Sequence, residues 1–292
     1  MRYVIGLDGG GTKTLAVLAD EHGQVIRRCV CEATNPNGQP LEQARARLQH
    51  ILLETAQGYD ISAVFAGVAG TGAADMRARY NQWVREIFPE TTAVRTDSDV
   101  CCAITATLDF ADGIAAIAGT GSSAFVRVDG AYTQVGGWGY FFEDAGSGFE
   151  FGRQALIHWM RVTDGREPPS PLSRLCLEAA GCGAKEALTA LYTGGRTEIA
   201  RFAPCVFTAL SEGDPAARSI VARQAEMYAE LLQVGGRLLS VRPVPVALGG
   251  SIWKQEAFRL AVSHLLGSDF DLILPKAEPV TGAVKEALRL LH

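Results

Sequence analysis

The amino-acid sequence predicts an α/β fold that is built from two similar halves. The chain opens with an apolar segment, a glycine-rich turn and a second apolar segment at residues 3–19, which is the pattern of a β-hairpin. A second hairpin of the same kind begins after Gly113, once strands and helices have alternated along the first half. The repeated order of elements indicates an internal duplication, with domains at residues 1–112 and 113–280.

The first half is predicted to form a three-stranded antiparallel meander followed by alternating helices and strands. Runs of apolar and β-branched residues mark the strands, and apolar residues three or four positions apart, such as Leu41, Ala44 and Leu48, mark the helices. The predicted strands are residues 3–7, 15–19, 25–30, 61–68 and 92–95, and the predicted helices are residues 40–55, 73–88 and 100–108. A polar loop is expected at residues 33–38.

The second half is predicted to repeat the meander and then to form several helices. Its predicted strands are residues 114–118, 124–128, 133–135, 243–248 and 270–274. Its predicted helices are residues 149–161, a region broken by glycines at 171–201, the longest helix at 214–239 with Pro215 in its first turn, and a helix that ends near residue 266. The closing amphipathic helix, residues 281–292, is expected to pack back on the first domain.

The composition is that of an ordinary globular protein. The 292 residues are 48% hydrophobic and 20% charged, and the net charge of −5 comes without any block of Lys or Arg, so nucleic acid and acidic membrane surfaces are not expected partners. No stretch approaches the roughly 18 apolar residues of a membrane span, and Asp8 interrupts the only early apolar run, so no signal peptide is expected. Seven cysteines without a C-x-x-C pair indicate reduced thiols in a cytoplasmic protein, and a metal site built on Cys or His is not expected.

The first glycine turn is a candidate phosphate site. Asp8 ends the first predicted strand and is followed by three glycines, Thr12 and Lys13. Glycines let backbone N–H groups approach an anion closely, whereas a carboxylate holds a cation, for which Mg²⁺ bound through water is the natural candidate. The alternative is a tight turn with a solvated Asp8. A P-loop is excluded because Thr12 precedes Lys13, and a dinucleotide fingerprint is excluded because a strand follows the glycines.

A second glycine turn lies at the equivalent place in the second half. Gly119, Thr120, Gly121 and Ser122 separate two predicted strands, as the first turn does. A single glycine turn is weak support for phosphate binding. Two turns at matching positions of duplicated units favour phosphate binding over a simple structural turn.

Motifs along the whole chain resemble those of sugar kinases in the superfamily that unites actin, heat-shock-protein ATPases and hexokinase. Within that superfamily, the chain is similar to the branch of N-acetylglucosamine kinases and BadF/BadG ATPases. The motifs are L-D-G-G-G-T-K at residues 7–13, T-N-P-N at 34–37, T-D at 96–97, G-T-G-S at 119–122, G-G-W-G at 136–139, D-A-G-S at 144–147, V-A-L-G-G-S-I-W-K at 246–254 and T-G-A-V-K at 281–285.

The resemblance implies two RNase H-like (actin-like ATPase) domains with an interdomain cleft, in which ATP would span both glycine turns above a bound amino sugar. It implies that Asp8 positions Mg²⁺ and that Asp97 is the catalytic base. The residues implied to bind ATP are Gly10, Gly11, Thr12, Lys13, Gly119, Thr120, Gly121, Ser122, Gly249, Gly250 and Ser251. The residues implied to bind the sugar are Asn35, Gly137, Trp138 and Asp144.

The chemistry of these residue types agrees with the implied roles, although structural alternatives stay open. An aspartate is ionised at neutral pH and can accept a proton, and Asp97 ends a predicted strand, where α/β sheets place ligand-binding groups. Asp97 could instead cap the following helix. Trp138 could fill a domain interface and Asn35 could only stabilise its turn. Lys13 could be a solvated edge charge, and packing is favoured over adenine stacking for Trp253.

The implied function is ATP-dependent phosphorylation of an amino sugar, which gives N-acetylglucosamine 6-phosphate and ADP if the substrate is N-acetylglucosamine. Many relatives have D-E-G-S where this chain has Ala145 in D-A-G-S, so the identity of the sugar stays open and glucosamine is an alternative. A BadF-type ATPase without a sugar substrate is a second alternative, but no cysteines have the arrangement of iron–sulfur ligands. A non-catalytic sugar sensor is a third, although Asp8 and Asp97 are both present. A homodimer also stays open.

Overall fold

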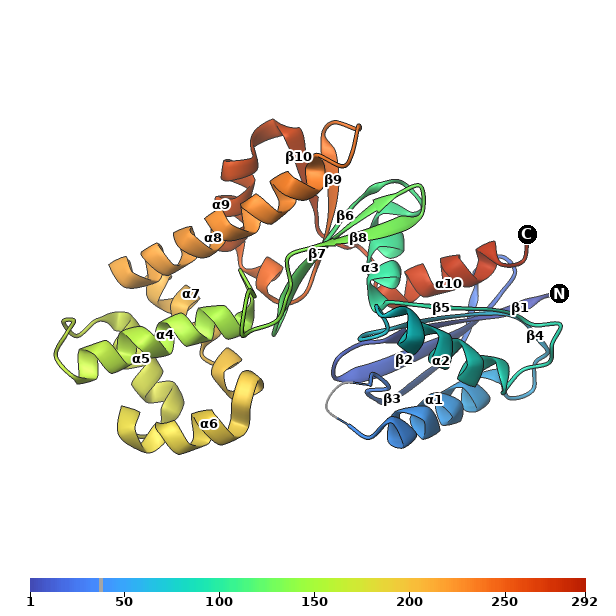
Figure 1. Ribbon diagram of the computed structural model, residues 1–292, viewed down its shortest axis with the longest axis horizontal. Helices are drawn as coiled ribbons and strands as arrows, with labels where there is room; N and C mark the ends of the chain where they lie inside the picture. The colour runs from blue at the N-terminus through green and yellow to red at the C-terminus, as the bar shows by residue number, and fades with distance from the viewer. Residues whose placement is uncertain (37–38) are drawn as a thin grey trace. The chain divides into compact units, whose positions relative to one another are not determined.

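The computed structural model describes residues 1–36 and 39–292, which form two compact units. Unit 1 comprises Met1–Ala111 and Pro275–His292, and unit 2 comprises Asp112–Leu274 (Figure 1). Asn37 and Gly38, which the sequence assigns to a polar loop, lie outside the described residues. Each unit contains its own five-stranded mixed sheet.

Unit 1 contains the meander and the two following strands in the order β3-β2-β1-β4-β5. The first three strands pair antiparallel, whereas β1, β4 and β5 are parallel. Their bounds are β1 Tyr3–Gly9, β2 Lys13–Asp20, β3 Val25–Glu32, β4 Ile61–Val68 and β5 Ala93–Asp97. The carboxyl ends of β1, β4 and β5 therefore meet at one edge of the sheet, where α/β proteins place their ligands.

Helices cover both faces of the sheet in unit 1. On one face, α1 Leu41–Ala56 and α2 Ala74–Arg85 bury apolar side chains against the odd-numbered residues of β1. The opposite face is covered by α3 Asp99–Leu108 and α10 Pro279–Arg289. Contact there is very close, because a Cβ added to Gly6 would lie 2.4 Å from the backbone nitrogen of Val284. Glycine at position 6 is what allows the closing helix to pack directly on β1.

Unit 2 repeats this arrangement of strands. Its order, β10-β9-β6-β7-β8, again joins an antiparallel meander to two parallel strands. The bounds are β6 Gly113–Ala118, β7 Ser122–Val128, β8 Ala131–Val135, β9 Val244–Gly249 and β10 Phe270–Ile273. Each glycine turn therefore connects the first two strands of a meander, β1 to β2 in unit 1 and β6 to β7 in unit 2.

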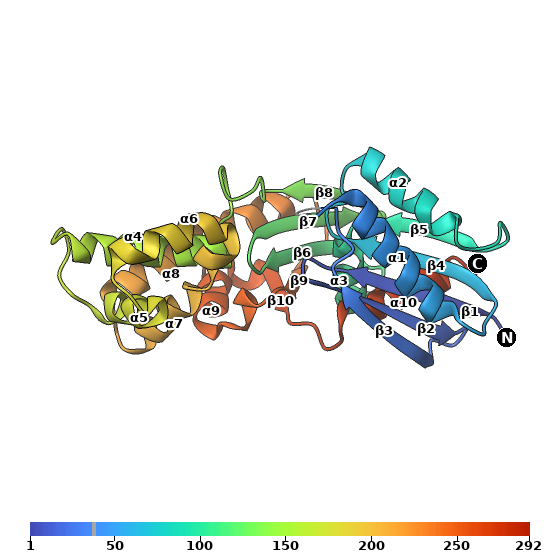
Figure 2. The ribbon, with the colours of Figure 1, turned by 90° about the horizontal axis from the view of Figure 1, so that it is seen from below.

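The helices of unit 2 are α4 Gly148–Thr163, α5 Pro171–Ala180, α6 Ala184–Ala200, α7 Ala203–Ser211, α8 Pro215–Gly236 and α9 Glu256–Leu266, with short 3-10 helices at Ile252–Lys254 and Gly267–Asp269. The pair α4 and α6 lies side by side (Figure 2). Trp253 is fully buried against Tyr228 and Phe258, and its Nε1 donates to the carbonyl oxygen of Ala116 at 2.9 Å. This places Trp253 in the core of unit 2, the packing role that the sequence favoured.

Most elements agree with the sequence prediction within a few residues, but α7 was not predicted. Its segment is short and follows a glycine-rich region, and its only starting signal is Pro204. All seven cysteines are free thiols, and only Cys31 and Cys182 are not buried. Among the described residues, every helix is too short or too polar to cross a membrane.

Candidate functional site

The parallel register of unit 1 brings two of the predicted acidic residues into one row. Asp8 on β1 pairs with Gly67 on β4, and Gly67 pairs with Asp97 on β5. Residues in one row of a parallel sheet project from the same face. That face is the one covered by α3, because a Cβ on Gly67 would lie 2.3 Å from Sγ of Cys102. Gly67 has no side chain, so no group from β4 separates the carboxylates of Asp8 and Asp97 at this edge of the sheet.

The carboxylate of Asp8 forms no ion pair with any described residue of unit 1. The pKa of Asp8 is raised from 3.8 to about 7, mainly by burial and in smaller part by the nearby carboxylates of Asp99 and Glu278, whereas Lys13 acts to lower it. Burial also raises the pKa of Asp99. No hydrogen bond reaches the Asp8 carboxylate from residues 1–36 or 39–292. The carboxylates of Asp8 and Asp99 are therefore both costly to ionise in the absence of a cation. A divalent cation bound beside them would stabilise both charged forms, so the pair is suited to binding one.

The first glycine turn is held from behind by Asn35. The buried Asn35 donates from Nδ2 to the carbonyl oxygens of Gly10 and Gly11, each at 3.2 Å, and the N–H of Gly10 donates to the carbonyl oxygen of Lys13 at 3.1 Å. Within the described part of the chain, the N–H groups of Gly11 and Thr12 have no hydrogen-bond acceptor. The turn thus has its carbonyl groups tied down and two donors left over, which is the arrangement that binds an anion.

Asp97 is oriented by two arginines. Its Oδ2 accepts from Arg95 at 2.9 Å, and its Oδ1 accepts from Arg77 at 3.3 Å and from the backbone N–H of Ser98 at 2.9 Å. The N-cap of α3 is Ser98, whose side chain accepts from the N–H of Val100. Ser98, and not Asp97, is therefore the N-cap residue of α3 in the structure.

The second glycine turn is held by Asp144. The N–H of Gly119 donates to the carbonyl oxygen of Gly121 at 2.8 Å, and the N–H of Ser122 donates to Oδ1 of the buried Asp144 at 2.7 Å. The N–H groups of Thr120 and Gly121 lack an acceptor among the residues that the structure describes. Both turns therefore share one design, in which a buried polar side chain fixes the turn and two N–H groups stay unpaired.

The other predicted residues of unit 2 surround this turn. Gly250 has a φ of +101°, and a Cβ there would lie 2.3 Å from the carbonyl oxygen of Ala118 and 2.8 Å from the nitrogen of Gly119. Gly137 has a φ of +72°, and a Cβ there would lie 2.5 Å from Cβ of Ser123. These close backbone approaches are available only to glycine. They bring the predicted segments 249–251 and 136–139 beside residues 119–122.

Two of the predicted sugar-binding residues differ sharply in their surroundings. Trp138 is 71% exposed. Asp144 is buried, and its Oδ2 accepts from Nη2 of Arg196 at 3.1 Å while its Oδ1 faces Ser122. In this structure, both carboxylate oxygens of Asp144 are engaged within unit 2.

Three arginines at these sites were not found by sequence reasoning. Arg77 lies on α2, Arg95 on β5 and Arg196 on α6, and each contacts a predicted aspartate. No motif contains Arg77 or Arg196, and their distance in sequence from Asp97 and Asp144 gives no local signal. Alternation along β5 could have placed Arg95 on the face of Asp97, since the two residues are two positions apart.

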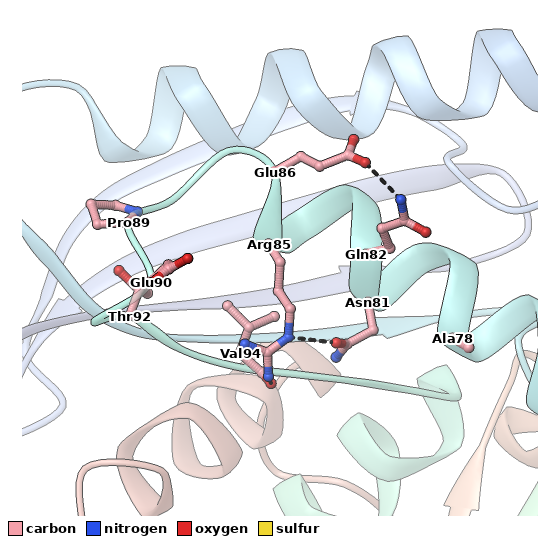
Figure 3. A pocket seen from close by; sticks show the side chains of 9 residues that line it. All are labelled: Ala78, Asn81, Gln82, Arg85, Glu86, Pro89, Glu90, Thr92 and Val94. Carbon is pink, nitrogen blue, oxygen red and sulfur yellow. Dashed lines mark hydrogen bonds between the residues drawn. The ribbon is translucent and has the colours of Figure 1, made fainter.

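A separate cavity of about 620 Å³ in unit 1 is lined by residues of α2, of the loop that follows it and of β5 (Figure 3). Its lining includes Arg85, whose Nε donates to Asn81 and whose Nη2 donates to the carbonyl oxygen of Val94. None of its lining residues belongs to the predicted site. The cavity is therefore a separate feature of unit 1, and its arginine is oriented by Asn81 and Val94.

Comparison with known proteins agrees with the motifs. A family model described as the BadF/BadG/BcrA/BcrD ATPase family matches residues 5–287. The chain is 28% identical over 235 residues to an N-acetylmuramic acid/N-acetylglucosamine kinase of Clostridium acetobutylicum, covering 77% of this chain and 76% of the relative. It is 26% identical over 247 residues to an N-acetyl-D-glucosamine kinase of Dictyostelium discoideum, covering 78% and 77%.

A solved structure from Chromobacterium violaceum, described as a candidate N-acetylglucosamine kinase, superimposes with a TM-score of 0.75 at 26% identity, covering 100% of this chain and 99% of that one. This likeness confirms the predicted α/β fold of the actin-like ATPase class.

Replacing Asp8 by Asn should make the metal-free protein more stable at pH 8. The buried carboxylate must lose its proton above pH 7 in the folded state, whereas in the unfolded chain it does so near pH 3.8, so ionisation opposes folding as the pH rises through this window. At about 1.36 kcal/mol per pH unit, the gain is at most about 4 kcal/mol. Melting curves from pH 4 to pH 8 measure it, and the difference should vanish near pH 4.

The control variant is Asp60→Asn, because Asp60 is an exposed aspartate of the same unit. It should melt like the wild type throughout. Added Mg²⁺ should raise the melting temperature of the wild type at pH 8 and leave that of Asp8→Asn unchanged. An Asp8→Asn protein that is less stable than the wild type at pH 8 without Mg²⁺ would contradict this account of Asp8.

Proposed function

The chain belongs to the BadF/BadG/BcrA/BcrD ATPase family, and from this premise we propose that it is an ATP-dependent kinase that phosphorylates a hydroxyl group of an amino sugar. The membership confirms the resemblance that the sequence motifs indicated. N-acetylglucosamine is the proposed substrate, with N-acetylglucosamine 6-phosphate and ADP as products, because the names of the relatives include that sugar. The alternatives are a glucosamine kinase and an ATPase without a sugar substrate.

The observation that carries this proposal is the pair of glycine turns with unpaired N–H groups. Each turn follows the first strand of its meander, and each retains two backbone donors that have no acceptor in the described chain. Gly11, Thr12 and Thr120 are exposed and Gly121 is half-buried, so these N–H groups are open to a ligand from solution, and phosphate oxygens are suitable acceptors for them. Two such turns in one chain suit a ligand with several phosphates, for which a nucleoside triphosphate is the obvious candidate.

Asp8 is the residue that would hold Mg²⁺. Its carboxylate fits because it is without a hydrogen-bond donor among the described residues and has a pKa raised to about 7 beside Asp99. Since no three His, Cys, Asp or Glu side chains in the described chain cluster as metal ligands, water would complete the coordination. When bound, Mg²⁺ neutralises charge on the phosphates and so favours their attack by a hydroxyl.

Asp97 is the proposed general base. Its carboxylate would accept the proton of the sugar hydroxyl while that oxygen forms a bond to the γ-phosphorus and the bond from phosphorus to ADP breaks. Arg95 and Arg77 hold the carboxylate in one orientation, at 2.9 and 3.3 Å. A base must be fixed relative to the attacking oxygen, because misplacement weakens proton transfer and attack together.

The sugar is proposed to contact Asn35, Gly137, Trp138 and Asp144. The exposed indole of Trp138 can cover the apolar face of a sugar ring. Asn35 holds the first glycine turn through its Nδ2, so a sugar bound at Asn35 would lie against that turn. Oδ2 of Asp144 accepts from Arg196, and a carboxylate oxygen can accept two hydrogen bonds, so Asp144 can accept a sugar hydroxyl while it keeps Ser122 and Arg196.

ATP turnover across a panel of sugars tests the function. ADP formation is measured with N-acetylglucosamine, glucosamine, glucose and no sugar. We expect N-acetylglucosamine to stimulate turnover by at least about tenfold over the sugar-free rate, because hydroxyl attack replaces slow hydrolysis. Preference for glucosamine would favour the first alternative. Turnover that is equal with and without every sugar would indicate the ATPase and overturn the kinase proposal.

Asp97→Asn should lower kcat about 10²- to 10⁴-fold with little change in ATP affinity. Asparagine retains the size of the side chain and one acceptor oxygen but cannot take the proton, and its NH2 group loses the hydrogen bond to one of the two arginines, so the melting temperature should fall without loss of folding. The measurements are kcat with N-acetylglucosamine, the Kd for ATP and the melting temperature. Retention of most of the wild-type kcat would exclude Asp97 as the base.

Glu286→Gln is the matched control for the loss of an ion pair. Glu286 on α10 accepts from the other nitrogen of Arg95, at 3.1 Å, and from the hydroxyl of Thr105 at 2.7 Å. Gln can keep hydrogen bonds to both partners, and the substitution removes the negative charge that pairs with Arg95. We expect its kcat to stay within about threefold of the wild-type value, which corresponds to less than about 1 kcal/mol of barrier. A loss as large as that of Asp97→Asn would assign both effects to the ion-pair network.

A further inference from the structure

Arg196 is brought to the second glycine turn by a break in α6. Gly195 has φ 59° and ψ −144°, so the helix is interrupted and begins again at Arg196. The second segment packs on α4 at very short range, since a Cβ on Gly152 would lie 2.0 Å from the carbonyl oxygen of Ile199. A left-handed glycine and a tight helix contact therefore fix the position of this arginine.

The guanidinium group of Arg196 lies directly on Gly121. A Cβ at position 121 would be 1.5 Å from Nη2 of Arg196, so the guanidinium group occupies the space that a side chain at this position would take. Nη2 also donates to Oδ2 of Asp144 at 3.1 Å, and the guanidinium lies 5.7 Å from the ring centroid of Tyr140. The arginine is thus held between an aromatic ring, a carboxylate and the turn.

One donor of this guanidinium is unsatisfied. Nε of Arg196 is buried and has no hydrogen-bond partner among the described residues. A buried donor on a charged group that lacks an acceptor is unfavourable, and native structures seldom retain one without a reason. Together with the unpaired N–H groups of Thr120 and Gly121, it gives this turn several donors and a positive charge.

We propose that Arg196 donates hydrogen bonds to a phosphate group of the nucleotide bound at residues 119–122, with Asp144 as the positioning residue that holds the guanidinium over the turn. This inference rests on the proposed kinase function. Arginine is suited to this role because its planar fork of donors matches phosphate oxygens. A purely structural arginine that only neutralises Asp144 would account for the ion pair, but not for the unpaired Nε beside two unpaired backbone donors.

Nucleotide binding by Arg196→Gln and Arg196→Lys tests the proposal. The Kd values of AMPPNP and adenosine are measured for each variant, with the melting temperature as a check of folding. We expect Arg196→Gln to weaken AMPPNP binding about tenfold to a hundredfold, as for loss of a charge-assisted hydrogen bond, and to leave adenosine binding within twofold. Arg196→Lys keeps the charge without the fork, so its loss should be intermediate.

The matched control is Arg201→Gln. Arg201 lies one turn further along the chain, is about as exposed as Arg196 and also pairs with a carboxylate, Glu198, but it does not reach the glycine turn. It should bind AMPPNP within twofold of the wild-type affinity.

Two results would overturn the proposed role of Arg196 without contradicting the proposed kinase function. In the first, both Arg196 variants bind AMPPNP within twofold of the wild type. In the second, they lose AMPPNP and adenosine affinity equally, as a structural role requires. If Arg196→Gln does not fold, Arg196→Lys decides by the same criteria. A wild-type protein that does not bind AMPPNP would overturn the proposed function, and the role of Arg196 with it.

Discussion

The structure depends on how its two glycine turns are held. In each turn, a buried polar side chain from a distant segment fixes the backbone: Asn35 donates to two carbonyl groups of the first turn, and Asp144 accepts from Ser122 in the second. These contacts satisfy inward-facing polar groups of the turns, and two N–H groups in each turn have no acceptor among residues 1–36 and 39–292. Because these residues are exposed or only partly buried, a rigid turn keeps their donors accessible, and neighbouring backbone donors held in this way form a concave site that suits an anionic ligand.

The two aspartates at the sheet edge of unit 1 share a row but have opposite surroundings. Asp97 has two arginines and a backbone N–H, whereas Asp8 has a second acidic residue nearby and a pKa raised to about 7. When similar groups are placed in such different environments, their chemical tasks differ too. A carboxylate held in place by arginines suits a base, and a carboxylate that is costly to ionise alone suits a cation ligand.

The fold was largely predictable because its signals are local. Apolar runs, glycine turns and the restart after Gly113 depend on a few consecutive residues, and strand ends alone place Asp8 and Asp97 at one edge of a parallel sheet. The partners of these residues were not predictable. Arg196 reaches Asp144 across 52 positions, and only the packing of α6 on α4 brings them together. Helix α7 was missed for a related reason, since its burial against α4 and α5 stabilises a segment with weak local signals.

The most direct test of the central claim, that both glycine turns bind phosphate, is the backbone amide NMR spectrum of the protein with and without Mg²⁺ and AMPPNP. The account predicts large shifts for the amides of Gly11, Thr12, Thr120 and Gly121, which gain an acceptor. The amides of Gly10 and Gly119, already bonded inside their turns, provide the internal control and should move less. Saturating nucleotide that leaves the four unpaired amides unshifted, or that shifts them no more than the two controls, would contradict the account.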